Sequence, residues 1–198
     1  MNARIAIAFA VAAACLIVHP LLAHTRRPGV WARTALAAWA LAIAYLALLS
    51  RRPSEEALVY LKPLRALRYI VRLKVPLGEW ARTLLREGIG AAMAQVRLRW
   101  KFFSWDPILN VLVFLPPGTL LPWCSERVHR HLWIAALAGL AASMCIEFTQ
   151  LAFRLGTFEM DDMICNTLGA ALGALIFRAY ARRNAQGRRA GRGRPDRP

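Results

Sequence analysis

The chain has 198 residues, of which 58% are hydrophobic, and it carries a formal net charge of +16. A mean hydropathy of +0.36 is too high for an ordinary soluble domain of this length, so we expect an integral membrane protein. The basic residues lie between and after the apolar blocks, where anionic lipid headgroups account for them, and this pattern argues against a nucleic-acid partner.

The N-terminal part, residues 1–50, contains two apolar blocks of a length that can cross a bilayer as helix. Residues 5–23 resemble a secretory signal peptide, but the run is long and position 21 is leucine, so we favour a retained first helix that ends or kinks at Pro20. A short basic turn follows, and residues 35–50 are predicted to form the second transmembrane helix.

Residues 51–105 form a basic connector. One set of its basic residues steps by three, three and four, which places the set on one helical face: Lys62, Arg65, Arg68 and Arg72. This pattern predicts an amphipathic helix between Pro63 and Pro76 that lies in the membrane interface, and the alternative is a solvated basic connector. Farther along, apolar and basic residues alternate over residues 96–102, which predicts an extended segment.

The C-terminal half, residues 106–180, is predicted to be a core of three further transmembrane helices: 107–123, 132–153 and 162–180. The run Pro116-Pro117-Gly118 must break or bend the first of these helices, because proline removes backbone donors. Residues 181–198 consist mostly of arginine, glycine and proline, and predict a disordered basic tail. The expected fold is therefore an all-α polytopic bundle of about five transmembrane helices plus an interfacial helix.

Each core helix carries a stripe of polar residues on one face. In the last two helices the stripe steps by four, three and four, the period of one helical face. These residues are Ser143, Glu147, Gln150 and Arg154 in one helix, and Asp162, Asn166, Gly169 and Gly173 in the other. Asp106 and Asn110 are likewise four apart in the first core helix. Polar groups inside apolar helices are costly without partners, so the three stripes are expected to meet in one cluster.

The orientation in the membrane depends on the first core helix. Basic residues are divided almost equally between the two sides when there are five spans, whereas a re-entrant loop at residues 107–123 would put nearly all of them inside. A re-entrant loop would, however, separate Asp106 and Asn110 from the other two stripes. We therefore favour five spans through the cytoplasmic membrane, with a cytoplasmic tail and an extracytoplasmic polar cluster.

Glu147 is the most informative single residue, because a carboxylate inside an apolar run costs about 2.5–3.5 kcal/mol on insertion scales. The alternative to a functional role is a hydrogen-bonded glutamate that only holds helices together. Arg154 lies two turns farther along, so its expected partner is Asp162 on the next helix. Capping of the last helix could explain one of Asp161 and Asp162, but it does not explain Asn166.

Several other features carry simpler interpretations. Gly169 and Gly173 suit close helix packing. Ser143 has no histidine or lysine on its stripe to activate it, so a serine hydrolase is not supported. His129 and His131 show no metal-ligand spacing, and no metal or other cofactor is predicted. The cysteines lie in or beside apolar blocks without a Cys-x-x-Cys pair, which is typical of small apolar side chains: Cys15, Cys124, Cys145 and Cys165.

Three segments in order resemble the VanZ-like family of bacterial membrane proteins, and together they span about residues 106–177. Residues 110–118 (NVLVFLPPG) resemble the family's Asn-Val-Leu-Leu-Phe-x-Pro-x-Gly, and residues 146–150 (IEFTQ) resemble Ile-Glu-x-x-Gln. Residues 158–169 (FEMDDMICNTLG) resemble Phe-Asp-x-x-Asp-x-x-x-Asn-Thr-x-Gly. Two departures stand out: Glu159 replaces the usual Asp, and Gly156 stands where the family often has Arg, which leaves Arg154 as a displaced substitute.

The resemblance implies a helical cell-envelope protein, in a family named for a member linked to teicoplanin resistance. The first hypothesis is a protein whose polar cluster interacts with membrane lipids, and in particular with an envelope lipid or a lipid-linked envelope precursor. Its functional residues would be Asp106, Asn110, Glu147, Gln150, Arg154, Asp162 and Asn166. The alternatives are a membrane-embedded lipid-modifying enzyme with Glu147 or Asp162 as acid or base, and a purely structural bundle.

Overall fold

The computed structural model of the protein describes residues 13–14, 17–18, 20–55, 58–61, 63, 77–101 and 106–192. Four helical segments in this part are long and apolar enough to cross a membrane: Pro28–Leu49, Asp106–Cys124, Trp133–Ala152 and Met160–Gln186. They correspond to the second to fifth predicted spans, and the all-α membrane class is confirmed. The first predicted span, residues 5–23, lies largely outside the described residues.

The elements follow one another as helices joined by short turns. The first half contains α2 (Pro28–Ala44), the π-helical turn η1 (Tyr45–Leu49), the short strand β1 (Val59–Tyr60) and α4 (Leu77–Lys101). The second half contains α5 (Asp106–Val113), α6 (Leu115–Cys124), α7 (Glu126–Arg130), α8 (Trp133–Ala152), β2 (Phe158–Glu159) and α9 (Met160–Arg192). The strands β1 and β2 pair in parallel, with Val59 opposite Phe158.

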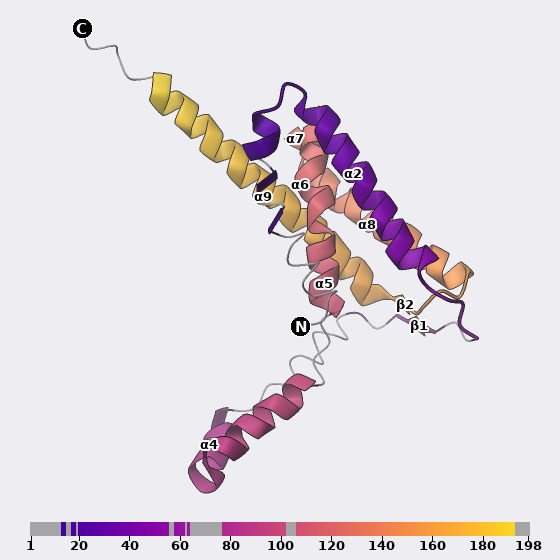
Figure 1. The fold of residues 1–198 in the computed structure, drawn as a ribbon, viewed down its shortest axis with the longest axis vertical. Helices are drawn as coiled ribbons and strands as arrows, with labels where there is room; N and C mark the ends of the chain where they lie inside the picture. The colour runs from indigo at the N-terminus through magenta and orange to yellow at the C-terminus, as the bar shows by residue number, and fades with distance from the viewer. Residues whose placement is uncertain are drawn as a thin grey trace.

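The course of the chain brings four helix ends together at one end of the bundle. The end of η1, the start of α5, the end of α8 and the start of α9 all lie near the β1–β2 pair, whereas α7 lies at the other end (Figure 1). This is the arrangement that the five-span interpretation needs for the polar stripes to meet. We call these two ends the β end and the α7 end.

Helix α9 is the centre of the bundle, and it packs against α5, α6 and α8, while α2 packs against α6. Small residues allow this packing. A Cβ atom added at Gly169 or Gly173 would collide with a backbone carbonyl of the neighbouring helix, at Val111 or Leu115 respectively. The backbone of α9 therefore contacts the backbone of α5–α6 directly, and the packing interpretation of the two glycines is confirmed.

The first core helix is interrupted, as the proline run predicts. The break is at Phe114, between α5 and α6, and Pro116 and Pro117 fall in the first turn of α6, where their missing N–H groups cost nothing. Trp39 of α2 holds this point, because its Nε1–H donates to the carbonyl of Val113 at 2.9 Å and its ring packs edge-on against Phe114. The two halves continue in one direction in Figure 1 and form one span rather than a loop that turns back.

The distribution of side chains is that of a membrane protein. The buried groups include Ser143, Glu147 and Gln150, whereas large apolar side chains such as Leu49 (77% exposed) and Trp133 (62% exposed) lie on the outside. In water this distribution would be unfavourable, but in a bilayer the outer apolar side chains contact lipid.

Two predictions for the basic segments are wrong. Residues 96–101 are helical, as part of α4, and not extended. Leu, Arg, Gln and Lys are good helix formers, and an alternation over a few residues does not outweigh them. The tail is helical as far as Arg192 rather than disordered from Arg182. Alanine and arginine have high helix propensity and favour the continuation of α9. The predicted interfacial helix, which begins at Pro63, lies almost entirely outside the described residues.

Candidate functional site

The polar stripes meet at the β end of the bundle. We call the following group the polar cluster: Arg51, Asp106, Ser143, Glu147, Gln150, Glu159, Asp162 and Asn166. Its members come from α5, α8, α9, the strand β2 and the segment that follows η1. Ser143, Glu147, Gln150 and Asn166 are 0%, 3%, 4% and 6% exposed, so these groups are removed from both lipid and water.

Ser143 and Asn166 join α8 to α9 in the middle of the cluster. The Nδ2 of Asn166 donates to the Oγ of Ser143 at 2.8 Å, as the facing stripes predict. The side-chain oxygen of Asn166 is buried and has no hydrogen-bond partner among the described residues. A buried amide oxygen without a donor costs about 1–3 kcal/mol, so this atom is an open acceptor within the cluster.

Glu147 is held by the loop that follows its own helix. Its Oε2 accepts the backbone N–H of Glu159 at 3.0 Å, and the Oε1 of Glu159 in turn accepts the hydroxyl of Thr157 at 3.1 Å. These bonds fix the carboxylate of Glu147 toward β2 and the start of α9. The buried glutamate thus has a hydrogen-bond partner, and that partner is a backbone amide.

Gln150 connects the cluster to the second span. Its Nε2 donates to the carbonyl of Ala47 at 2.9 Å. Ala47 lies in the π-helical turn η1, where the last turn of the span is wider and the N–H of Ser50 bonds back to Tyr45. Such turns are frequent at functional sites because they release or redirect backbone groups. The periodicity of the sequence gives no sign of this turn.

Asp162 lies at the electrostatic centre of the cluster. Among the described residues, its carboxylate interacts with three other acids, Glu147, Glu159 and Asp106, and with one cation, Arg51. Arg51 also acts on Glu147. In the part of the chain that the structure describes, the cluster therefore contains four carboxylates and one guanidinium, and it is rich in acceptors.

Gly156 has no side chain, and this leaves room for the guanidinium of Arg51. A Cβ atom added at Gly156 would lie 2.5 Å from Nη1 of Arg51 and 3.8 Å from Oε1 of Gln150. The guanidinium therefore packs directly over the glycine, beside the buried amide of Gln150. In the motif that this loop resembles, an arginine often stands at this position. Here a chain segment from outside the motif supplies the guanidinium instead.

Arg154 has a different role from the predicted one. Arg154 follows the C-terminal end of α8 and has a φ of 54°. Its N–H donates to the carbonyl of Leu151, and the N–H of Leu155 donates to the carbonyl of Gln150. This is a Schellman motif with arginine at the left-handed position that usually holds glycine. The side chain is exposed, and the described residues contain no ion pair between it and Asp162, so this expected pairing is wrong.

The two predicted residues of α5 differ in placement. Asp106 is exposed at the first turn of α5, and it reaches the cluster through its interaction with Asp162. Asn110 lies half-buried one turn farther along, with no hydrogen bond that connects its side chain to the cluster among the described residues. Asp161 is buried beside Asp162.

The segment from Arg51 to Tyr60 crosses the β end next to the loop between α8 and α9. The N–H of Ser54 donates to the carbonyl of Arg154 at 2.8 Å, and that of Phe158 donates to Leu58 at 2.9 Å, next to the β1–β2 pair. The segment brings Arg51 to the cluster and lies between the second span and the long connector. Sequence reasoning assigned it to the connector alone.

The arrangement favours binding by hydrogen-bond acceptance. Carboxylate and amide oxygens outnumber the donors, and at least one acceptor is buried and open. A partner that carries hydroxyl, amide or ammonium donors would complement this cluster. In the described part of the chain, the acids do not form a group of three or more with the geometry to hold a metal ion.

The comparisons with known proteins agree with this fold. The family described as VanZ/LLP1 matches residues 36–181, a range that runs from the second span to the middle of α9 and includes every residue of the polar cluster. Comparison with curated proteins and with solved structures found no match. Because the family covers well over half of the chain, the protein belongs to the VanZ-like family of membrane proteins.

Proposed function

We propose that this VanZ-like membrane protein binds the donor-rich head of an envelope lipid or lipid-linked precursor in its polar cluster. The observation that carries the proposal is the gathering of Glu147, Asp162 and Asn166 inside an apolar bundle, with an open amide oxygen on Asn166. Buried polar groups in a membrane are costly, and a bundle held together by packing alone does not need them.

The charges of the cluster indicate which part of such a lipid would bind. Four carboxylates face one guanidinium, so a phosphate would meet mostly like charge. Sugar hydroxyls, peptide N–H groups and amines instead offer the donors that the carboxylates and Asn166 accept. The cluster would hold the sugar or peptide part of the molecule, and the phosphate and lipid chain would lie outside it.

The proposed orientation puts the polar cluster at the extracytoplasmic surface of the cytoplasmic membrane. The β end then faces outward and α9 leads to a cytoplasmic C-terminus. At that surface, binding of a lipid-linked precursor would reduce the effect of lipid-anchored glycopeptides of the teicoplanin type. The family to which the chain belongs supports this link to resistance.

The test uses the isosteric variants Glu147→Gln and Asp162→Asn in the full-length protein, purified from membranes with its lipids. We expect each variant to accumulate normally. The amount of envelope lipid that co-purifies with it should fall about tenfold or more, because a charge-assisted hydrogen bond is lost. Mass spectrometry of the co-purified lipids measures the loss, and teicoplanin susceptibility of the expressing cells measures the effect.

Glu126→Gln is the matched control, because Glu126 is an exposed acid at the α7 end. It should leave both measurements unchanged. Cluster variants that keep the same lipids and protect cells as well as the parent would refute the proposal. Loss of accumulation in proportion to the loss of protection would indicate a structural cluster.

A second candidate function is a lipid-modifying enzyme, favoured by the interaction between the carboxylates of Glu147 and Asp162. Two acids in different surroundings can divide the roles of general acid and general base. This function requires a chemical change in the lipid. If the parent converts an envelope lipid and Glu147→Gln still binds it without converting it, the enzyme hypothesis replaces the binding one.

A further inference from the structure

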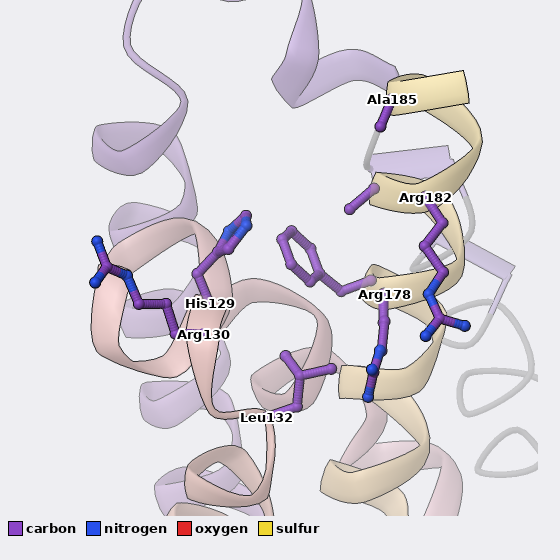
Figure 2. A pocket seen from close by; sticks show the side chains of 8 residues that line it. His129, Arg130, Leu132, Arg178, Arg182 and Ala185 are labelled. Carbon is purple, nitrogen blue, oxygen red and sulfur yellow. The ribbon is translucent and has the colours of Figure 1, made fainter. Parts of the chain in front are cut away.

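A second hollow lies at the α7 end of the bundle, away from the polar cluster. It encloses about 330 Å³ between the turn that follows α7 and the distal part of α9. His129 and Leu132 line it on one side, and Arg178 and Arg182 line it on the other (Figure 2). Phe177 also lines it. Its volume is at the lower end of the range for small-ligand sites.

Two arginines that line this hollow have no counter-ion among the described residues. Arg178 and Arg182 lie one turn apart on α9, and their side chains extend in the same direction in Figure 2. No carboxylate of the described residues lies within ion-pair distance of either. Arg130 points away from the hollow, because its Nε bonds to Glu126 at 3.1 Å. Like charges one turn apart repel, so this pair favours a bound anion.

An apolar groove continues from the hollow along the bundle. It has a volume of about 470 Å³, and it shares Arg130, Leu132 and Arg178 with the hollow. His131 also lines it at this end, and the rest of its walls are apolar side chains of α8 and α9, among them Trp133, Ala136 and Leu175. A site with two arginines at its head and an apolar groove behind them has the shape and polarity of a phospholipid.

Aromatic rings pack against one another at the same end of the bundle. Trp123 packs against Phe177 with ring centroids 5.7 Å apart and against Tyr180 at 6.4 Å, and His129 packs edge-on against Phe177 at 5.1 Å. Tryptophan and tyrosine are enriched where the hydrocarbon meets the headgroups. The hollow therefore lies at the level at which lipid phosphates occur.

We propose that the hollow binds the phosphate of an anionic membrane phospholipid through Arg178 and Arg182, with one acyl chain in the adjoining groove. The ring nitrogens of His129 lie on the opposite side of the phosphate. A zwitterionic headgroup fits this site less well, because its ammonium group would meet two uncompensated guanidinium groups. The site is separate from the polar cluster, and it does not depend on the function proposed for that cluster.

The test measures lipid binding to the full-length protein by native mass spectrometry, with phosphatidylglycerol and phosphatidylethanolamine of identical acyl chains. We expect phosphatidylglycerol to bind more tightly than phosphatidylethanolamine. The double variant Arg178→Gln/Arg182→Gln should weaken the binding of phosphatidylglycerol about tenfold, because two charge-assisted contacts are lost. The matched control is Arg127→Gln/Arg183→Gln, which removes the same charge from exposed positions of α7 and α9 outside the hollow. It should change the affinity less than twofold.

Two further arms separate a lipid from a free phosphate and check the fold. Glycerol 3-phosphate should not compete, and Ala136→Leu, which fills the groove, should weaken phosphatidylglycerol. Equal losses in the two double variants would attribute binding to diffuse charge and overturn the proposal. Competition by glycerol 3-phosphate at the concentration of the lipid would overturn it in favour of a soluble phosphate. Lipid-free thermal unfolding should be alike for both double variants, so that a loss of binding reports the site and not the fold.

Discussion

At the scale of single residues, the arginine at the polar cluster is Arg51 and not Arg154, which the sequence suggested. Arg51 faces Glu147 and Asp162 and packs over Gly156, whereas Arg154 is an exposed residue that ends α8 in a left-handed conformation. The guanidinium of the cluster therefore comes from the end of the second span. The arginine inside the family-like segment acts through its backbone.

These roles predict stability changes of opposite sign. Arg51→Gln should lower the free energy of unfolding, because the acids lose the one cation that the described residues bring to them. The loss should not exceed about 1 kcal/mol, because Arg51 is exposed to solvent. Arg154→Gly should raise it by about 0.5–1 kcal/mol, because glycine adopts a positive φ without strain. Thermal unfolding in detergent measures both. A destabilised Arg154→Gly with an unchanged Arg51→Gln would restore the assignment made from the sequence.

At the scale of elements, the glycines of α9 set how closely the helices approach. A methyl group at Gly173 would collide with the carbonyl of Leu115 and lie 2.9 Å from the backbone nitrogen of Thr119. These neighbours are backbone atoms of α6, which cannot move aside as a flexible side chain would. The close approach of α8 and α9 likewise depends on a glycine, because a Cβ atom added at Gly139 would lie 2.5 Å from that of Ala170.

Gly173→Ala should therefore destabilise the protein although alanine is the better helix former. Alanine gains about 1 kcal/mol in helix propensity, but the clash should outweigh it and leave a net loss of about 1–3 kcal/mol. Gly90→Ala in α4 is the matched control, because nothing lies within 4 Å of its added methyl group, and it should be neutral or stabilising. Equal effects of the two substitutions on thermal unfolding would contradict this account of the packing.

The elements also divide what the sequence can predict from what it cannot. Spacings of three and four identify one face of a helix, so the pairing of Ser143 with Asn166 and the burial of Glu147 follow from the sequence. The bond from Glu159 to Glu147 depends on the conformation of a loop, and the approach of Arg51 depends on a contact between distant segments. Neither contact leaves a periodic pattern in the sequence. One signal for Arg51 did exist, because five spans put the end of the second span on the side of the cluster.

At the scale of the whole molecule, the structure separates two ends of different chemistry. The β end carries the acidic polar cluster, and the α7 end carries aromatic rings and the two uncompensated arginines of the hollow. In the proposed orientation the acidic end faces outward and the basic end faces the cytoplasmic leaflet, where anionic lipid is attracted to basic groups. One bundle would then contact different lipid chemistry at each surface.

The orientation can be tested by placing single cysteines at the two ends. In a background with the four native cysteines replaced by alanine, Ser54→Cys marks the β end and His131→Cys marks the α7 end, and both positions are exposed. A membrane-impermeant maleimide should label Ser54→Cys in intact cells and His131→Cys only after permeabilisation. The reverse pattern would invert the proposed orientation. Labelling of both from one side would contradict the course of the chain through the bundle.

The length of α9 has a consequence for whatever follows the bundle. A helix of 33 residues is about 50 Å long, whereas the hydrocarbon of a bilayer is about 30 Å thick. The last turns, which carry most of its arginines, must extend past the lipid as a rigid helix instead of lying along the surface. A fluorescent protein attached at the C-terminus would be carried well clear of the headgroups, at a height that a proline placed at Ala185 would alter.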